Sequence, residues 1–149
     1  MSSGTAVAVV LCAIGGLAGA VQAAVMGELG GRVGIAPALV FAVGVSLACS
    51  LAVLVVWERN FDGVRAAVDE PLWLWLGGVM SVFIVLSITV AAPRIGVAAT
   101  IGIVIAGNLV MAALIDQFGL LGQEEVAITA TRLVGLLFLA AGATLSLIR

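Results

Sequence analysis

Two amide side chains, Gln22 and Asn108, stand out as polar groups within long apolar segments of this sequence. Each amide offers two N–H donors and a carbonyl acceptor, and lipid can satisfy none of them. Both amides must therefore face protein or a polar cavity. They either join neighbouring helices by hydrogen bonds or form a neutral substrate site near the membrane midplane, where transporters bind substrate. The hydroxyls of Ser81 and Thr100 could contribute to such a site.

A second polar pair stands at the ends of two apolar segments. Asp116 ends one segment, and Arg132 lies near the start of the next. Consecutive membrane helices are antiparallel neighbours, so an ion pair across this hairpin is geometrically easy. We expect the two residues either to form a structural ion pair or to couple substrate movement to a proton.

The residues needed for catalysis are missing. The sequence contains no histidine, and no two carboxylates share an apolar segment. It also lacks the glycine-rich phosphate-binding pattern and any metal ligands at suitable spacing. Cys12 and Cys49 stand in apolar runs without an acid or base partner. We therefore expect no enzyme, catalytic residue, metal or cofactor.

The elements that carry these residues are membrane helices. Hydrophobic residues make up 64% of the 149 residues and charged residues 9%, whereas soluble domains carry roughly 25% charged residues. A spanning helix needs about 20 apolar residues. We predict an all-α integral membrane protein, one domain over residues 1–149, in a bacterial-type inner membrane. The five expected spans are residues 6–29, 35–57, 72–92, 95–116 and 126–148, with Pro93 and Arg94 ending the third.

Charge in the loops bears on orientation and on partners. A polar loop, residues 58–70, separates the second and third spans and is flanked by Trp57, Trp73 and Trp75, as in an interfacial aromatic belt. No basic arm suggests nucleic acid. No span has a central carboxylate, which disfavours a proton antiporter for organic cations. A neutral or weakly polar substrate fits the amides better.

The arginines divide evenly between the two membrane sides. Arg59, Arg65 and Arg132 lie on the side of the N-terminus, and Arg32, Arg94 and Arg149 on the other. Orientation follows the bias of such charges, and here the bias is zero. The chain can then insert both ways, and two opposite copies can pair as an antiparallel homodimer with inverted-repeat architecture. The alternative is a fixed topology set by other cues.

Small residues repeat every fourth position in three spans, which favours close helix contact in lipid. They are Gly15 and Gly19; Ala38, Ala42, Ser46 and Ser50; and Ala98, Gly102 and Ala106. Each stripe either packs helices together within or between subunits or lines a substrate passage.

The chain resembles the YdcZ-like proteins, small five-helix membrane proteins associated with the drug/metabolite transporter superfamily. The matching stretches are Gly19–Gln22, Trp73–Gly78, Pro93–Thr100, Ala106–Asn108 and Leu114–Gly119. The family typically has glutamine at the position of Asn108 and often an amide at that of Ala23. The resemblance implies an antiparallel pair and, by association, a transporter.

These observations predict a dual-topology homodimer that transports a small neutral or amphipathic compound, with membrane lipids and an unknown substrate as its other partners. One alternative is a nontransporting protein that binds lipid or scaffolds a partner. Another is a small ion channel made by the same inverted pairing.

Overall fold

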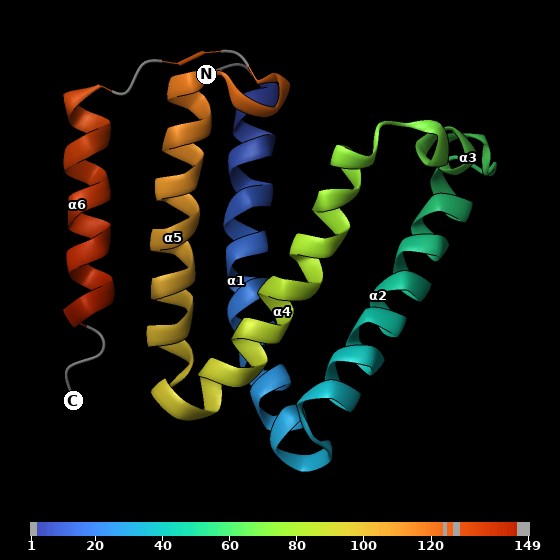
Figure 1. Ribbon diagram of the computed structural model, residues 1–149, viewed down its shortest axis with the longest axis horizontal. Coiled ribbons are helices and arrows are strands. Elements are labelled where there is room, and N and C mark those ends of the chain that lie inside the picture. Colours follow the sequence, from blue (N-terminus) through green and yellow to red (C-terminus); the bar gives the residue numbers. More distant parts are fainter. Residues whose placement is uncertain (1–2, 124, 127–128, 146–149) are drawn as a thin grey trace. The chain divides into compact units, whose positions relative to one another are not determined.

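The computed structural model describes residues 3–123, 125–126 and 129–145, and all the regular structure in these residues is helical. This part of the chain forms six α-helices and two short 3-10 helices (Figure 1). They are α1 Ser3–Val33, α2 Ile35–Trp57, α3 Asp62–Asp69, η1 Leu72–Trp75, α4 Leu76–Ile95, α5 Val97–Phe118, η2 Leu120–Gly122 and α6 Ala130–Leu145. The prediction of an all-α protein is confirmed for these residues.

Among the described residues, four helical stretches are long and apolar enough to cross a membrane. They are Gly4–Val33, Ile35–Trp57, Leu72–Ile95 and Val97–Phe118. α6 covers 16 residues, fewer than the roughly 20 that a span needs. Parts of the expected fifth span, residues 127–128 and 146–148, lie outside the described residues. A fifth span therefore stays a prediction.

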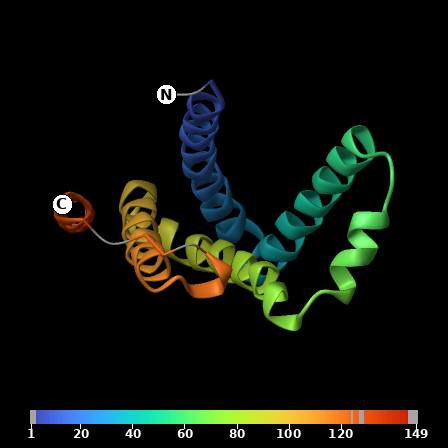
Figure 2. The same ribbon diagram turned by 90° about the horizontal axis from the view of Figure 1, so that it is seen from above.

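The chain divides into two compact units. One comprises Met1–Ala24 and Arg94–Arg149, and the other Val25–Pro93. In the first unit α5 packs along α6, and η2 contacts α5. In the second unit α3 links the end of α2 to η1 and α4 (Figure 2). The single membrane domain expected over residues 1–149 stays a prediction.

A single glycine interrupts the helical backbone at two places. Gly34, between α1 and α2, has φ 93° and ψ 157°, and Gly96, between α4 and α5, has φ 86° and ψ 157°. This conformation is essentially restricted to glycine. Helical hydrogen bonding resumes directly afterwards, because the N–H of Ala38 donates to the Gly34 carbonyl and that of Thr100 to the Gly96 carbonyl, each over 3.1 Å.

The end of α4 differs from the expectation that Pro93 and Arg94 terminate the third span. α4 continues through Pro93 to Ile95. Proline has no N–H, so it removes the helical hydrogen bond to the carbonyl of Thr89, four residues earlier. Membrane helices tolerate this loss where protein surrounds the freed group. The break falls instead at Gly96, and α5 therefore begins at Val97.

The polar loop expected at residues 58–70 contains a helix, α3, Asp62–Asp69. Three of its four apolar residues, Val64, Ala67 and Val68, follow the i, i+3, i+4 spacing that places them on one face. The N–H of Asp62 donates to the side-chain oxygen of Asn60 over 3.3 Å. An acidic residue in the first turn also suits the positive end of the helix dipole. α3 is thus a short amphipathic helix between two spans.

The end of α1 lies against α4 within the second unit. A Cβ atom built on Gly27 would lie 3.3 Å from the Cβ of Ala92, and one on Gly30 would lie 2.7 Å from the Cγ2 of Thr89. Thr89 and Ala92 are buried. The backbones approach this closely because both α1 positions lack a side chain.

Candidate functional site

The two amides of the predicted site are exposed on their helices. Gln22 lies on α1 and Asn108 on α5. The structure gives neither side chain a hydrogen-bond partner among the described residues. An unsatisfied polar group in hydrocarbon costs several kcal/mol, on the order of a lost hydrogen bond or more. Each amide therefore needs a partner that the described part of one chain does not supply.

The two hydroxyls of the predicted site differ in environment. Ser81 lies on α4 and is exposed. Thr100 is 2% exposed, and its hydroxyl donates to the Gly96 carbonyl over 2.8 Å. That bond uses the donor of Thr100 within its own helix, as threonine commonly does in helices. In this structure the Thr100 hydroxyl therefore stabilises the start of α5 after Gly96. A ligand contact by Thr100 stays a prediction.

The contact between Asp116 and Arg132 also stays a prediction. The carbonyl of Asp116 accepts a hydrogen bond from the N–H of Val126 over 2.7 Å, which ties the later part of the α5–α6 connection to the last turn of α5. The side chain of Arg132, in the first turn of α6, lies outside the described residues.

Part of the α5 stripe faces α6. Ala98 and Gly102 line a pocket of about 280 Å³ between these helices. The rest of its lining is apolar, and the residues are Ile105, Phe138, Leu139, Gly142 and Ala143. Small side chains from both helices thus leave space along their contact. The lining offers no hydrogen-bonding side chain, so this pocket suits a hydrocarbon chain and not a polar solute.

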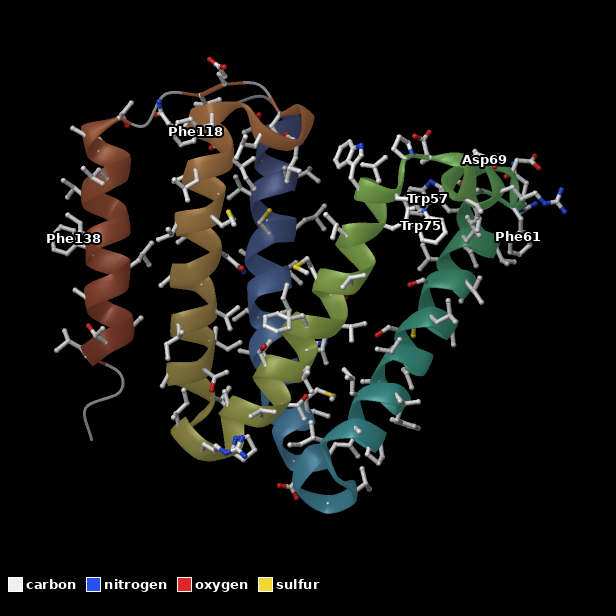
Figure 3. All side chains as sticks on the ribbon, in the orientation of Figure 1. Trp57, Phe61, Asp69, Trp75, Phe118 and Phe138 are labelled. Atoms are coloured by element: carbon white, nitrogen blue, oxygen red, sulfur yellow. The ribbon has the colours of Figure 1, made fainter. Side chains whose placement is uncertain are left out.

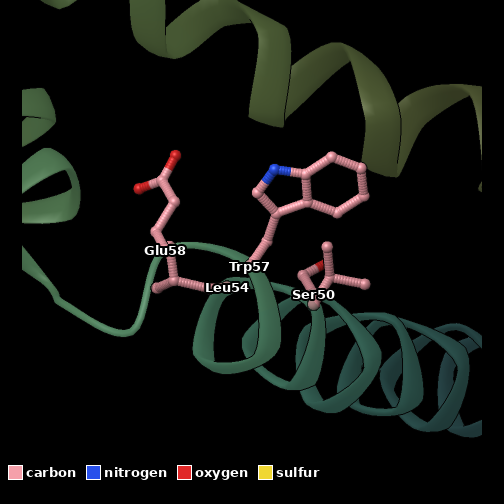
Figure 4. Close-up of a pocket in the computed structure, with 5 residues that line it drawn as sticks. Ser50, Leu54, Trp57 and Glu58 are labelled. Atoms are coloured by element: carbon pink, nitrogen blue, oxygen red, sulfur yellow. The ribbon is translucent and has the colours of Figure 1, made fainter.

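Two further pockets lie within the second unit, around the segment between α2 and α4. One, of about 380 Å³, is lined by Ser50, Val53, Leu54, Trp57 and Glu58 (Figure 4). The other, of about 420 Å³, is lined by Val64, Ala67, Val68, Glu70, Leu74 and Trp75. Figure 3 shows Trp57 and Trp75 at the same end of this unit as Phe61 and Asp69. Indole and carboxylate groups together are typical of a membrane interface.

The remaining stripe residues are placed as follows. Ala38 is fully buried, Ala42 and Ala106 are half-buried, and Ser46 is exposed. The hydroxyl of Ser50 donates to the Ser46 carbonyl over 2.8 Å. A Cβ atom added to Gly15 or Gly19 would meet no atom within 4 Å among the described residues, so packing of these two glycines against another helix stays a prediction.

Four residues that bring α1 and α4 into close contact were not among the predicted ones. Gly27 and Gly30 of α1 meet Thr89 and Ala92 of α4. The sequence does contain a signal for them, because Gly27 and Gly30 stand three positions apart before Gly34. Residues at this spacing share a helix face.

One family model matches the chain. The family is described as "Putative inner membrane exporter, YdcZ", and the match covers residues 7–145. It includes all four stretches that could cross a membrane, except the first residues of α1. No curated protein and no solved structure matches the chain significantly.

Proposed function

Because the chain belongs to the YdcZ family and is a multi-pass inner membrane protein, we propose that it transports a small neutral or amphipathic solute as an antiparallel homodimer. The observation that carries this proposal is the pair of exposed amides, Gln22 and Asn108, on membrane helices. A polar solute or a second copy of the chain would supply the hydrogen bonds that they lack.

The charge distribution supports the antiparallel pairing. With three arginines on each side, neither orientation is favoured. Five spans would place the two ends of the chain on opposite sides of the membrane. Two oppositely inserted copies would then form a dimer with a twofold axis in the membrane plane, the arrangement of many transporters built from inverted repeats.

Reconstituted protein tests the substrate class. We expect efflux or uptake of one or more members of a library of small neutral and amphipathic solutes in proteoliposomes. Gln22→Leu and Asn108→Leu should each reduce that flux by about tenfold, the effect of losing about 1.4 kcal/mol of binding free energy. Gln123→Leu, which changes an exposed amide between α5 and α6, is the matched control and should transport normally.

The oligomeric state of the same variants separates binding from structure. Hydrogen bonds between membrane helices average about 0.6 kcal/mol, so either leucine variant should remain a dimer. If both variants fall apart into monomers or aggregate, the amides join helices and do not bind substrate. If both transport normally, the substrate site lies elsewhere.

The apolar pocket between α5 and α6 favours a second candidate, a lipid-binding protein without transport. Lipid that copurifies with the protein, together with no flux of any library member, would support that function. Ion currents in a planar bilayer without solute flux would instead support a small channel.

A further inference from the structure

A short sequence recurs within the chain. Arg32-Val33-Gly34-Ile35-Ala36 returns as Arg94-Ile95-Gly96-Val97-Ala98, and the two substitutions exchange valine and isoleucine. The offset is 62 residues, as from Gly34 to Gly96. At this offset the start of α2 at Ile35 corresponds to the start of α5 at Val97, and the two helices have 23 and 22 residues.

The backbone repeats along with the sequence. The two glycines share ψ 157° and differ by only a few degrees in φ, 93° against 86°. Four residues after each glycine stands a buried residue whose N–H returns to the glycine carbonyl over 3.1 Å, Ala38 in the first copy and Thr100 in the second. Two unrelated breaks would have no reason to agree in sequence, dihedral angles and burial together.

The helices before the two glycines each bury the same two positions. Met26 corresponds to Ile88 at the same offset, and both are buried. Gly27 corresponds to Thr89, and both of these are buried as well. α1 and α4 therefore turn the same face inward.

The contacts between these two faces are reciprocal. Gly27 meets Ala92, and Gly30 meets Thr89. Since Gly27 is equivalent to Thr89 and Gly30 to Ala92, exchanging the two copies turns one contact into the other. Such exchange is the defining property of an interface about a twofold axis. All four residues belong to the Val25–Pro93 unit.

We infer that the residues around Gly34 and those around Gly96 are two copies of one helix junction, and that the end of α1 crosses α4 with local twofold symmetry at a contact that stays closed during the proposed transport. Only α2 among the spans separates α1 from α4, so the two helices run towards the same side of the membrane. That the contact stays closed during transport rests on the proposed function.

The chemistry of the crossing suits a contact that stays fixed. Gly27, Gly30 and Ala92 have no rotatable side chain, and the hydroxyl of Thr89 is held by the Val85 carbonyl at 2.7 Å. A contact without alternative rotamers has one packed arrangement. No rearrangement of these side chains could replace the packing, so the contact persists while other parts of the protein move.

Disulfide crosslinking tests the crossing. In a background with Cys12→Ser and Cys49→Ser, the pair Gly27→Cys and Ala92→Cys should crosslink within one chain on mild oxidation, because the two Cβ positions are 3.3 Å apart and disulfides join Cβ atoms at about 3.5–4.5 Å. The symmetry-related pair Gly30→Cys and Thr89→Cys should crosslink too. Gly27→Cys with Val90→Cys, on another face of α4, is the control and should not.

Each outcome has a defined meaning. Crosslinking of both symmetric pairs in well-folded protein, judged by a single gel-filtration peak, supports the local twofold crossing of α1 and α4. A control pair that crosslinks as readily, or a symmetric pair that does not crosslink in folded protein, overturns it. If the cysteine variants do not fold, the melting temperature of Gly30→Ala with and without Thr89→Ser tests the same contact. If Thr89→Ser does not recover the stability lost in Gly30→Ala, the crossing is overturned.

Transport by the protein crosslinked at positions 27 and 92 tests whether the contact stays closed. Using a library solute that the reduced protein transports, we expect the oxidised protein to retain flux within about twofold, since the bond joins groups that do not separate during transport. Loss of flux on oxidation that is reversed by reduction overturns a contact that stays closed. If the reduced protein transports no solute, the proposed function and the closed contact both fail, whereas the crosslink yield still decides the local twofold crossing.

Discussion

One methyl group, on Thr89, limits how closely a side chain at residue 30 could pack where α1 and α4 cross. The Cγ2 of Thr89 occupies the space where a Cβ of residue 30 would stand, at 2.7 Å. The hydroxyl of the same residue has a separate task, the hydrogen bond to the Val85 carbonyl. Serine would keep that hydrogen bond and remove only the methyl group. The crossing can therefore be tested by removing one carbon atom.

Gly30→Ala should lower the melting temperature in detergent, because overpacking costs about 1–3 kcal/mol. The double variant Gly30→Ala with Thr89→Ser should recover most of that loss, giving a coupling energy of about 0.5–3 kcal/mol. Gly44→Ala, where a Cβ meets open space, is the control and should change stability by less than about 0.5 kcal/mol. Equal losses in the single and double variants would contradict the contact.

The pairing of Asp116 with Arg132 is a prediction at the same scale. Asp116→Asn and Arg132→Gln should each lower the melting temperature, because each leaves one charge near the apolar boundary without its partner. The double variant should lose less than the sum of the two, since residues in contact couple. Strict additivity of the two changes would mean that the side chains do not interact.

At the scale of helices, two glycines mark the boundaries between α1 and α2 and between α4 and α5. Gly34 and Gly96 both hold φ near 90°, which side chains other than glycine rarely adopt. Each allows one helix to follow another with a single intervening residue. The equivalence of the two breaks predicts equivalent sensitivity to substitution.

Gly34→Ala and Gly96→Ala should each destabilise the protein by about 1–3 kcal/mol, the cost of one residue in a strained backbone region. The two losses should be similar because the dihedral angles are similar. Gly44→Ala, within α2 and with open space around a Cβ, is the matched control. Thermal unfolding in detergent measures all three, and tolerance of alanine at Gly96 but not at Gly34 would contradict their equivalence.

The sequence predicted the ends of a helix well where a glycine or a charged residue directly flanks the apolar segment. The second span, residues 35–57, coincides with α2 because Gly34 precedes it and Glu58 follows it. The end of α4 was not predicted, since proline is a weaker terminator in a membrane helix than in water. α3 was missed because its four apolar residues are few beside the charges of the loop.

The candidate site was predictable only in part. The sequence identified Gln22 and Asn108 as polar positions on apolar helices, and the structure places both on exposed surface. Their hydrogen-bond partners could not be read from one sequence, because in lipid such partners come from other helices or other molecules. The repeat around Gly34 and Gly96 is faint in the sequence because only five residues carry it and two of them are exchanged between valine and isoleucine.

For the whole molecule, the predicted division of the arginines, three on each side of the membrane, would leave insertion without a preferred orientation. A reporter fused to the C-terminus should then be accessible from both sides of the membrane. Two or three lysines added after Arg149 should direct that end to the cytoplasm. Labelling of the unmodified chain from one side only would exclude dual topology.

The positions of the aromatic residues have a spectroscopic consequence. The chain has three tryptophans and no tyrosine, and Trp57, Trp73 and Trp75 are all exposed around the connection between α2 and α4. The intrinsic fluorescence of each copy therefore originates at one face of the bilayer. In sealed vesicles, a water-soluble quencher added outside would reach about half of the emission from a population inserted both ways, and the rest only after permeabilisation. A uniformly oriented population would respond in a single step, so the native protein carries its own optical reporter of orientation.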